Sequence, residues 1–346
     1  MFNQPAVTEE KTVMINICRR VILHVTMLAA MAFAAGALAQ PVSLTIGSFS
    51  QGSGWYVYAV NLAELLQKSL PPGSKVDAPP IAGAVGNPRL VSVGKADLAF
   101  GMALVGHWAR KGEVSYDKPM ENLRALVGGW DQYYLAVISG GRDMGPGLEK
   151  FLQKDRPSTR VVMLPRGGVG SVGGQQMLRL MNAAEEAIKQ RGGNYEYTSF
   201  GAIKGRFASR SADLFIQVAN PGHPAITEIA QNNPVTFLQP PKSVLDEMSK
   251  RYGWQIALMP KGTFPSQGQD VRLPGTTTTL FASTRMSDDL AHTIVKTICE
   301  KTDRLKAAHK ALAGFDCSKG AWREEVNGLP LHAGAARYYR ERGWLK

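Results

Sequence analysis

Short apolar runs alternate with helically spaced apolar residues from Gln40 to the C-terminal end of the sequence. The first run, residues 42–47, alternates as a strand does. A turn containing Gly52 and Gly54 separates it from a helical pattern over residues 55–70. Repeated strand–turn–helix units of this kind are typical of α/β proteins with mostly parallel sheets.

The same pattern predicts the remaining elements. Strands are expected at 75–79, 97–101, 123–129, 134–139, 160–164, 195–200, 213–218, 235–238, 255–259 and 276–283. Helices are expected at 87–93, 175–189, 203–209, 224–232 and 242–251, and in a tail from residue 287.

Two features of the chain predict a two-lobed organisation: one connection that is too short for a helix, and one proline break. No helix fits between the strands at 123–129 and 134–139, so the chain is expected to pass directly into a second lobe there. The Pro240-Pro241 break marks the return. We therefore predict an α/β clamshell of two Rossmann-like lobes joined by a hinge, with residues 40–129 and 240–346 in lobe I and residues 130–239 in lobe II.

The N-terminal segment has the features of an export signal. Lys11, Arg19 and Arg20 precede an apolar run over residues 21–37, and Ala37-Leu38-Ala39 fits the small-residue cleavage pattern. A membrane anchor is the alternative, although it would need about 20 apolar residues and this run ends in small ones. The sequence predicts a signal peptide over residues 1–39, cleaved near Ala39, and a periplasmic product.

The charge of the chain bears on the ligand or partner, and its cysteine content bears on a possible disulfide. The chain carries a net charge of +12, and the part from residue 40 onward is also basic, which favours an anionic ligand or surface. The sequence contains no run of five like charges, and this argues against a nucleic-acid partner. Cys299 and Cys317 are the cysteines that follow residue 39. They either pair in the oxidising periplasm or stay buried thiols.

Two glycine-rich turns carry the candidate binding chemistry, residues 48–55 and 166–174. Each leads from a strand into a helix, and a helix N-terminus offers unpaired N–H groups and partial positive charge to an anion. The first turn adds Ser53, Gly54 and the aromatic pair Trp55 and Tyr56. The second turn contributes Gly170, Ser171, Val172 and Gly173, with Ser171 as a hydroxyl donor. Shaping tight turns is the alternative role of such glycines.

Polar residues next to these turns are further candidates. Asn220 and His223 follow a strand and precede a helix that begins near Pro224, so they either border the cleft or serve as structural hydrogen-bonding groups. Arg166 either pairs with a ligand carboxylate or forms a surface ion pair.

Catalytic, cofactor and metal signatures are missing from the sequence. Residues 168–173 match G-x-G-x-x-G, but the acidic residue that a dinucleotide site needs about 20 residues later is absent. Val169 breaks the G-x-S-x-G hydrolase elbow around Ser171. The histidines show no triad or zinc spacing. We therefore predict no catalytic residue, no cofactor and no metal.

Several segments, in order, resemble the TAXI family of TRAP-transporter receptors. The segments are Leu44-Thr45-Ile46-Gly47 with Trp55-Tyr56, Gly83 to Asn87, Gly94 to Phe100, Asn122 to Leu126, Gly222-His223-Pro224, Leu331 to Ala335 and Tyr338 to Gly343. The resemblance implies a type II periplasmic-binding fold without catalysis. It also implies a small organic anion (an amino acid, dicarboxylate or oxoacid) as ligand and a TRAP membrane permease as partner.

Two departures from the family bear on the ligand. Met102-Ala103-Leu104 stands where the family has Q-S-D, so Met102 replaces a polar contact, and the loop around Ser171 differs from the family's G-S-G-T. These changes favour either a ligand less polar than glutamate or an orphan member of the family. The alternative functions are a ligand sensor coupled to a membrane signalling partner and an exported enzyme.

Overall fold

The computed structural model describes residues 40–140, 147–152 and 158–346. The predicted signal peptide, residues 1–39, lies outside the described residues. Contacts divide the described residues into two compact units, one that includes residues 40–42 and 70–74 and one that includes residues 43–69 and the described part of 75–346. In the first, the Ser74 hydroxyl accepts a hydrogen bond from Val42 N (3.1 Å) and donates one to Pro71 O (2.7 Å).

Every strand and helix named below belongs to the larger unit. The strands are β1 (Ser43–Gly47), β2 (Lys75–Asp77), β3 (Leu98–Met102), β4 (Leu123–Val127), β5 (Gln132–Gly140), β6 (Arg160–Met163), β7 (Asn194–Tyr197), β8 (Leu214–Ala219), β9 (Val235–Phe237), β10 (Gln255–Met259) and β11 (Val271–Ser283). The α-helices are α2 (Gly54–Ser69), α3 (Gly86–Val93), α4 (Ala103–Lys111), α5 (Leu148–Phe151), α6 (Val169–Leu180), α7 (Glu185–Gln190), α8 (Phe200–Ala208), α9 (Pro224–Asn232), α10 (Lys242–Tyr252), α11 (Asp288–Glu300), α12 (Thr302–Ala308), α13 (Glu324–Asn327) and α14 (Ala333–Glu341). Two 3₁₀ turns, η1 (Lys310–Leu312) and η2 (Cys317–Lys319), precede α13.

The strand order repeats itself. One half of the sheet runs β2-β1-β3-β11-β4 and the other β7-β6-β8-β5-β9. In each half the first three strands are parallel, and the next one, β11 or β5, is antiparallel to them. The α/β class predicted from the sequence, with the type II periplasmic-binding arrangement, is confirmed. The lobe boundaries at residues 130 and 239 stay a prediction.

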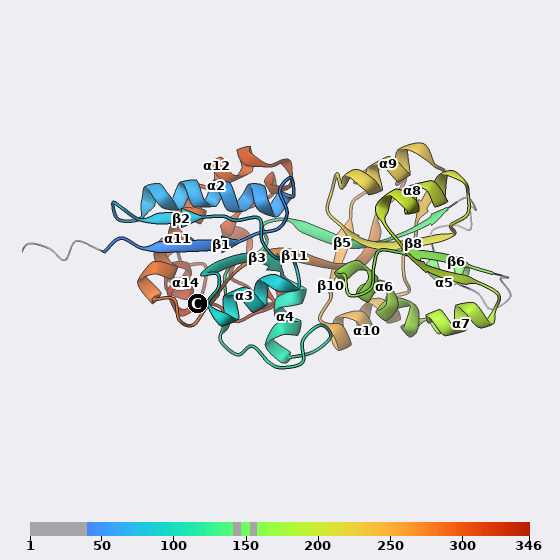
Figure 1. Ribbon diagram of the computed structural model, residues 1–346, viewed down its shortest axis with the longest axis horizontal. Helices are drawn as coiled ribbons and strands as arrows, with labels where there is room; N and C mark the ends of the chain where they lie inside the picture. The colour runs from blue at the N-terminus through green and yellow to red at the C-terminus, as the bar shows by residue number, and fades with distance from the viewer. Residues whose placement is uncertain (1–39, 141–146, 153–157) are drawn as a thin grey trace, which may run out of the picture. The chain divides into compact units, whose positions relative to one another are not determined.

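Strand β11 connects the two halves. Its first residues pair with β10 and β5, and its last residues pair with β3 and β4. The chain passes from β4 to β5 without a helix, as the sequence predicts. Figure 1 shows α2 and α12 on one side of β1 and β3, with α3 and α4 on the other. It shows α8 and α9 on one side of β5 and β8, with α6 and α10 on the other.

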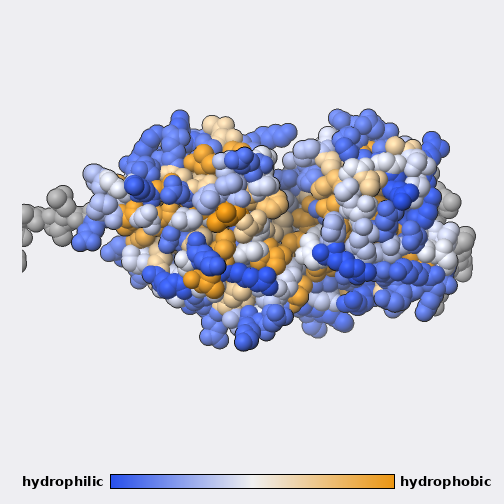
Figure 2. Space-filling model, in the orientation of Figure 1, coloured by the Kyte–Doolittle hydropathy of each residue, from blue (hydrophilic) through white to orange (hydrophobic). Residues whose placement is uncertain are grey.

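The helices bury the faces that their apolar spacing indicates. In α2, Tyr58, Leu62 and Leu66 are fully buried, which is the i, i+4, i+8 face of one helix. On the surface in view in Figure 2, apolar residues gather near α3, where the last residue of the helix, Val93, is 66% exposed. None of the described helices is long and apolar enough to cross a membrane.

Two expectations about helices were wrong. The helix expected at 175–189 begins earlier, at Val169, and breaks after Leu180, with Asn182 at φ +53° before α7 begins. Helix α4 was not expected, because Met102-Ala103-Leu104 continues the apolar run of β3. Its N-terminus is fixed by a tertiary contact, a hydrogen bond from Leu104 N to Thr276 Oγ1 (3.1 Å).

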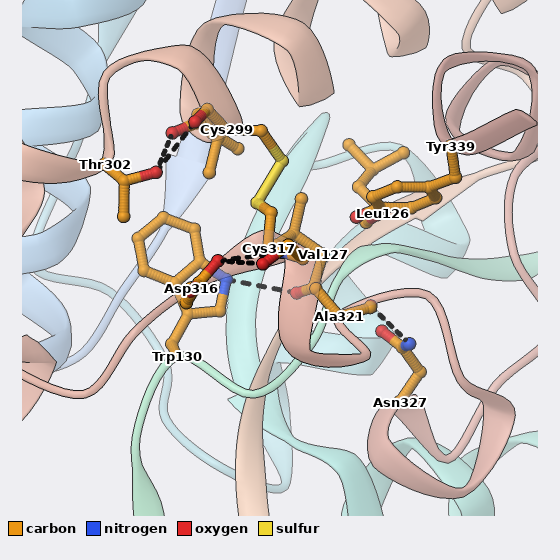
Figure 3. Close-up of a disulfide and its surroundings, with 12 residues drawn as sticks. Leu126, Val127, Trp130, Cys299, Thr302, Asp316, Cys317, Ala321, Asn327 and Tyr339 are labelled. Atoms are coloured by element: carbon orange, nitrogen blue, oxygen red, sulfur yellow. Dashed lines mark hydrogen bonds between the residues drawn. A yellow bond between two sulfur atoms is a disulfide. The ribbon is translucent and has the colours of Figure 1, made fainter. Parts of the chain in front are cut away.

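Cys299 and Cys317 form a disulfide, one of the two alternatives that the sequence leaves open (Figure 3). The bond joins the end of α11 to η2, which is 18 residues further along the chain. Close to it, Phe315 stacks on Trp130 with ring centroids 4.8 Å apart. The disulfide therefore ties the segment that contains η1 and η2 to the body of the protein.

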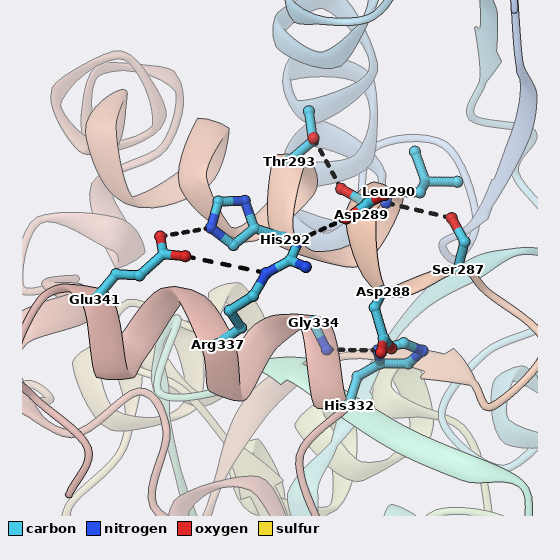
Figure 4. Close-up of polar contacts among 10 residues, drawn as sticks. All are labelled: Ser287, Asp288, Asp289, Leu290, His292, Thr293, His332, Gly334, Arg337 and Glu341. Atoms are coloured by element: carbon cyan, nitrogen blue, oxygen red, sulfur yellow. Dashed lines mark hydrogen bonds and ion pairs between the residues drawn. The ribbon is translucent and has the colours of Figure 1, made fainter. Parts of the chain in front are cut away.

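The C-terminal helix is held against α11 by polar contacts (Figure 4). His292 Nε2 lies 2.7 Å from Glu341 Oε2, and Arg337 donates to Asp289 (2.8 Å). His332 caps α14: its Nδ1 accepts from Gly334 N (3.2 Å), so its Nε2 carries the proton and donates to Met286 O (3.0 Å). Burial lowers the pKa of His332, which keeps this capping histidine neutral.

Replacing both cysteines tests the contribution of the disulfide. Because the bond closes a loop of 18 residues, the Cys299→Ser, Cys317→Ser variant is expected to lose about 3 kcal/mol of unfolding free energy. Urea unfolding of the oxidised proteins measures the difference, and the single variant Cys299→Ser, which also lacks the bond, is the control. A double variant as stable as the wild type would contradict a formed disulfide.

Candidate ligand-binding site

The first glycine-rich turn ends in a capped helix. Ser53 Oγ accepts a hydrogen bond from Tyr56 N (3.2 Å) at the start of α2, as an N-cap serine does. Gly54 is half-buried, and a methyl group added to it would lie 3.4 Å from the Tyr58 hydroxyl and 3.7 Å from His309 Nε2. The beginning of α2 therefore faces two polar side chains at van der Waals distance.

Trp55 is buried and acts as a link between elements. Its indole Nε1 donates to Thr278 Oγ1 on β11 (2.9 Å), and its ring meets that of Tyr133 edge to face at 6.5 Å. Met102, at the end of β3, lies directly opposite Thr278 in the sheet. Tyr56, the next residue of α2, is half-buried. The structure thus brings the first turn, Met102 and the middle of β11 together.

A carboxyl group that the sequence analysis missed lies at the centre of this group. Asp131, just before β5, is 6% exposed, and its Oδ2 accepts a hydrogen bond from the Tyr58 hydroxyl (2.9 Å). Burial raises the pKa of Asp131 to about 6, even though hydrogen bonding by Thr278, Tyr58 and Asn220 lowers it. Its Oδ1 has no partner at normal hydrogen-bond geometry in the described part of the chain.

The turn between β8 and α9 approaches the same carboxyl group. Hydrogen bonding by the Asn220 side chain lowers the pKa of Asp131. In the same turn, Asn220 O accepts a hydrogen bond from His223 N (3.1 Å), and Gly222 has φ +78°. His223 packs on Phe200 at 5.3 Å, and no described residue bonds its Nδ1. Burial lowers the pKa of His223, so the ring is neutral near pH 7.

A lysine from the disulfide-anchored segment comes close to this turn. A methyl group added to Gly222 would lie 3.2 Å from Lys310 Nζ. Lys310 is exposed and has no acidic partner within the described ranges. It follows His309, whose ring meets that of Tyr58 at 5.3 Å. Thus α2, η1 and the β8–α9 turn surround the group of side chains at Asp131.

The second glycine-rich turn is helical for most of its length. Helix α6 begins at Val169, so Gly170 and Gly173 lie inside it, and both pack closely. An added methyl group would lie 1.9 Å from Gln217 Oε1 at Gly170 and 2.4 Å from the Trp254 ring at Gly173. These two glycines are required by close packing against β8 and against Trp254.

Ser171 and Arg166 have protein partners in this structure. The Ser171 hydroxyl is buried and donates to Pro165 O and Gly168 O (both 2.9 Å), while Val172 is half-buried in the same turn. Arg166 pairs with Glu185 (2.5 Å) and lies over the Tyr197 ring at 4.0 Å. Of the alternatives left open for Arg166, the ion pair is the one that the structure contains. What this turn exposes is the backbone at Gly167 and Gly168.

The sequence-predicted residues therefore fall into two sets. Ser53, Gly54, Trp55, Met102 and Asn220 are connected through Thr278, Tyr58 and Asp131. The turn at 166–173 instead packs on strand β8 at Gln217 and on strand β5 at Leu135. One signal could have revealed Asp131: it is the acidic residue in the run Gly-Gly-Trp-Asp-Gln-Tyr-Tyr between two apolar strands. Lys310 and His309 gave no comparable signal.

A cavity of about 520 Å³ lies elsewhere in the larger unit, between α4, α10 and α13. Its walls include His107, Trp254, Ile256, Glu324 and Glu325, and none of the sequence-predicted site residues lines it. The described residues contain no group of three or more His, Cys, Asp or Glu side chains arranged to hold a metal ion.

The strand order is repeated, and in each half a helix follows the second strand of that order, α2 after β1 and α6 after β6; this arrangement defines the chain as a protein with the solute-binding-protein fold. A family model, that of the NMT1-like family, matches residues 46–343, and the chain belongs to this family.

The solved structures that align with this chain have low sequence identity to it. MatC from Rhodopseudomonas palustris with bound malate aligns at 13% identity and a TM-score of 0.49, covering 88% of this chain and 98% of that one. The periplasmic binding protein BugD aligns at 13% and 0.48 with the same coverage. The periplasmic aliphatic sulphonate binding protein SsuA from Escherichia coli aligns at 12% and 0.43, covering 87% and 84%.

Replacing Asp131 is expected to stabilise the protein in a pH-dependent way. The pKa of this carboxyl in the fold is about 6, above the ordinary 3.8, so its burial costs stability at pH values above about 6 and the cost disappears as the pH falls toward 4. Asp131→Asn should therefore raise the free energy of unfolding by up to about 3 kcal/mol near pH 8 and by almost nothing near pH 4. Urea unfolding at both pH values measures this.

The matched control is Asp246→Asn, which alters a half-exposed carboxylate that pairs with Lys242 on α10. Its effect should stay within about 1 kcal/mol at either pH. An Asp131→Asn effect that is equal at the two pH values would show that the carboxyl is not destabilised by burial.

Proposed function

We propose that this chain is an exported receptor that captures a small carboxylate-containing solute and delivers it to a TRAP-type membrane permease. The solute would be held between lobe I, residues 40–129 and 240–346, and lobe II, residues 130–239. The resemblance to the TAXI receptors supports the permease as partner, and membership of the NMT1-like family agrees with a binding rather than a catalytic role.

The observation that carries this proposal is the set of positively charged or partly positive groups at the N-terminus of α2 and at the β8–α9 turn. The N-terminus of α2, capped by Ser53, presents N–H groups and partial positive charge. Lys310 adds a full positive charge without an acidic partner in the part of the chain that the structure describes. Together they form an anion-binding environment beside the β8–α9 turn, which the chain contributes from the other half of the sheet.

The second turn would supply backbone contacts. Because the Ser171 hydroxyl is directed to Pro165 and Gly168, we assign the binding role there to main-chain N–H groups at the beginning of α6 rather than to that hydroxyl. The exposed Gly167 and Gly168 leave this end of the helix open to a ligand. A solute that contacts both turns would stabilise the closed arrangement of the lobes.

Ligand-dependent stability tests the proposal. Thermal unfolding of the chain from Gln40 onward is measured against amino acids, dicarboxylates and 2-oxoacids, each well above the concentrations at which such receptors bind. A solute at about 100 times its dissociation constant adds about 2.7 kcal/mol, which shifts the midpoint by several degrees. Lys310→Ala should weaken binding about tenfold or more, because it removes a charge-assisted contact.

Lys319→Ala is the control for the loss of one positive charge, since Lys319 lies on the same segment and its Nζ is 3.9 Å from Asp316 Oδ2. If no carboxylate-containing solute shifts the unfolding midpoint, or if Lys310→Ala and Lys319→Ala have the same effect, the proposal is wrong.

A further inference from the structure

The cavity of about 520 Å³ between α4, α10 and α13 is not used by the proposed function. It is lined by the first part of α4, the end of α10, the beginning of β10 and α13. Cavities that hold small molecules commonly measure about 300–1,000 Å³. This cavity is therefore large enough for a ligand of its own, apart from the two glycine-rich turns.

Hydrogen bonds hold the walls of the cavity in place. Trp108 Nε1 donates to Tyr252 O (2.8 Å) and joins α4 to the end of α10, and Figure 1 shows these two helices next to each other. Gln255 Nε2 donates to Glu325 O (2.5 Å), and the Thr277 hydroxyl donates to the main chain of α13 (2.7 Å). Because these elements are fixed to one another, a ligand meets a cavity that is already formed, and little ordering of the protein is needed.

One part of the lining is apolar. Leu104, Trp254 and Ile256 contribute it, and a hydrogen bond from Trp254 Nε1 to Gln176 Oε1 (2.9 Å) keeps the indole ring in position. Ile256 is 45% exposed although its side chain is large and apolar. An apolar group placed against Ile256 removes that surface from water, which is favourable. This part of the cavity therefore suits the hydrocarbon portion of a ligand.

The charged part of the lining is acidic. Glu324 and Glu325 on α13 are exposed at the cavity, and neither forms an ion pair in the described part of the chain. The described residues that line the cavity include no lysine and no arginine. Ser249 and Gly253 bring the C-terminal end of α10 to the same wall, and that end of a helix carries partial negative charge. The wall therefore favours a cation, although the chain as a whole carries a net charge of +12.

The His107 ring forms an uncharged side of the cavity. Burial, followed by the charge of Lys111, lowers the pKa of His107, and Glu113 and Glu324 raise it by less. The ring is therefore neutral near pH 7 and does not repel a cation. Lys111 itself is exposed and does not line the cavity.

We propose that this cavity is a second ligand-binding site and that its ligand is an organic cation, a primary amine with an apolar body. The ammonium group is bound by Glu324 and Glu325, and the apolar body packs on Trp254 and Ile256. The site goes beyond the proposed function, because that function concerns a carboxylate-containing solute held by the two glycine-rich turns. The two sites share none of their residues, so each can be tested without the other.

The experiment compares amines with alcohols of the same carbon skeleton. Isothermal titration of the chain from Gln40 onward is carried out with butylamine, phenethylamine and tryptamine, and with butanol, 2-phenylethanol and tryptophol. The wild type should bind at least one amine about tenfold or more tightly than the matched alcohol, because a charge-assisted hydrogen bond is lost with the ammonium group. The double variant Glu324→Gln, Glu325→Gln should lose this preference.

The control for the loss of two negative charges is Glu64→Gln, Glu228→Gln, which alters glutamates on α2 and α9 that pair with Lys68 and Lys204. It should keep the wild-type preference. Ile256→Ser should weaken the amine and its alcohol by the same factor, since the apolar body is common to both.

Three outcomes would overturn the inference: no amine binds, the amines bind no more tightly than their alcohols, or the Glu324→Gln, Glu325→Gln variant keeps the preference. A control variant that also loses the preference would overturn it as well, because the effect would then come from the overall charge. None of these outcomes affects the carboxylate receptor function, which the unfolding shifts and Lys310→Ala test separately.

Discussion

The structure around the candidate site depends on the threonine run in β11. Four consecutive threonines, residues 276–279, are buried in the middle of the strand that joins the two halves of the sheet. Thr276 accepts from the first turn of α4, Thr278 accepts from Trp55, and Thr277 and Thr279 donate to Val326 O. Buried hydroxyls need such partners. The strand therefore fixes the beginnings of α2 and α4 and the position of α13.

This arrangement explains how a group as unfavourable as Asp131 is tolerated. The carboxyl lies beside Thr278, between a helix of one half of the sheet and a turn of the other, and only part of its hydrogen-bonding capacity is used. A rigid neighbourhood of aromatic rings and threonines can hold a charge that would otherwise relax into water.

Much of the fold follows from local patterns in the sequence. Helix α9 begins and ends where it was predicted, because Pro224 sets its first turn, and β10 was also predicted with its observed bounds. Where tertiary contacts determine the secondary structure, the sequence pattern predicted it wrongly. The glycine-rich pattern at 170 and 173 predicted a loop. Both residues are helical, and they pack so closely on Gln217 and Trp254 that only glycine fits. Helix α4 begins where Thr276 of β11 accepts a hydrogen bond from Leu104 N.

The candidate site could be predicted only in part for the same reason. The turn at Asn220 follows from residues close in sequence and is observed. Ser53 was expected to be a hydroxyl donor to the ligand, and its hydroxyl caps α2 by accepting from Tyr56 N. The contribution of Lys310 depends on a segment 18 residues long that a disulfide closes. The environment of Asp131 is assembled from α2, β11 and the turn after β8. Such groupings are properties of the folded chain, and no spacing along the sequence encodes them.

Hydrogen exchange in the presence and absence of the most stabilising carboxylate solute tests the central claim most directly. If one solute bridges the two turns, amides at residues 53–55 and at 169–171 should both become protected in the same sample, together with the turn at 220–223. Protection confined to one of the two turns, or to the cavity walls near His107 and Trp254, would contradict this account of the site.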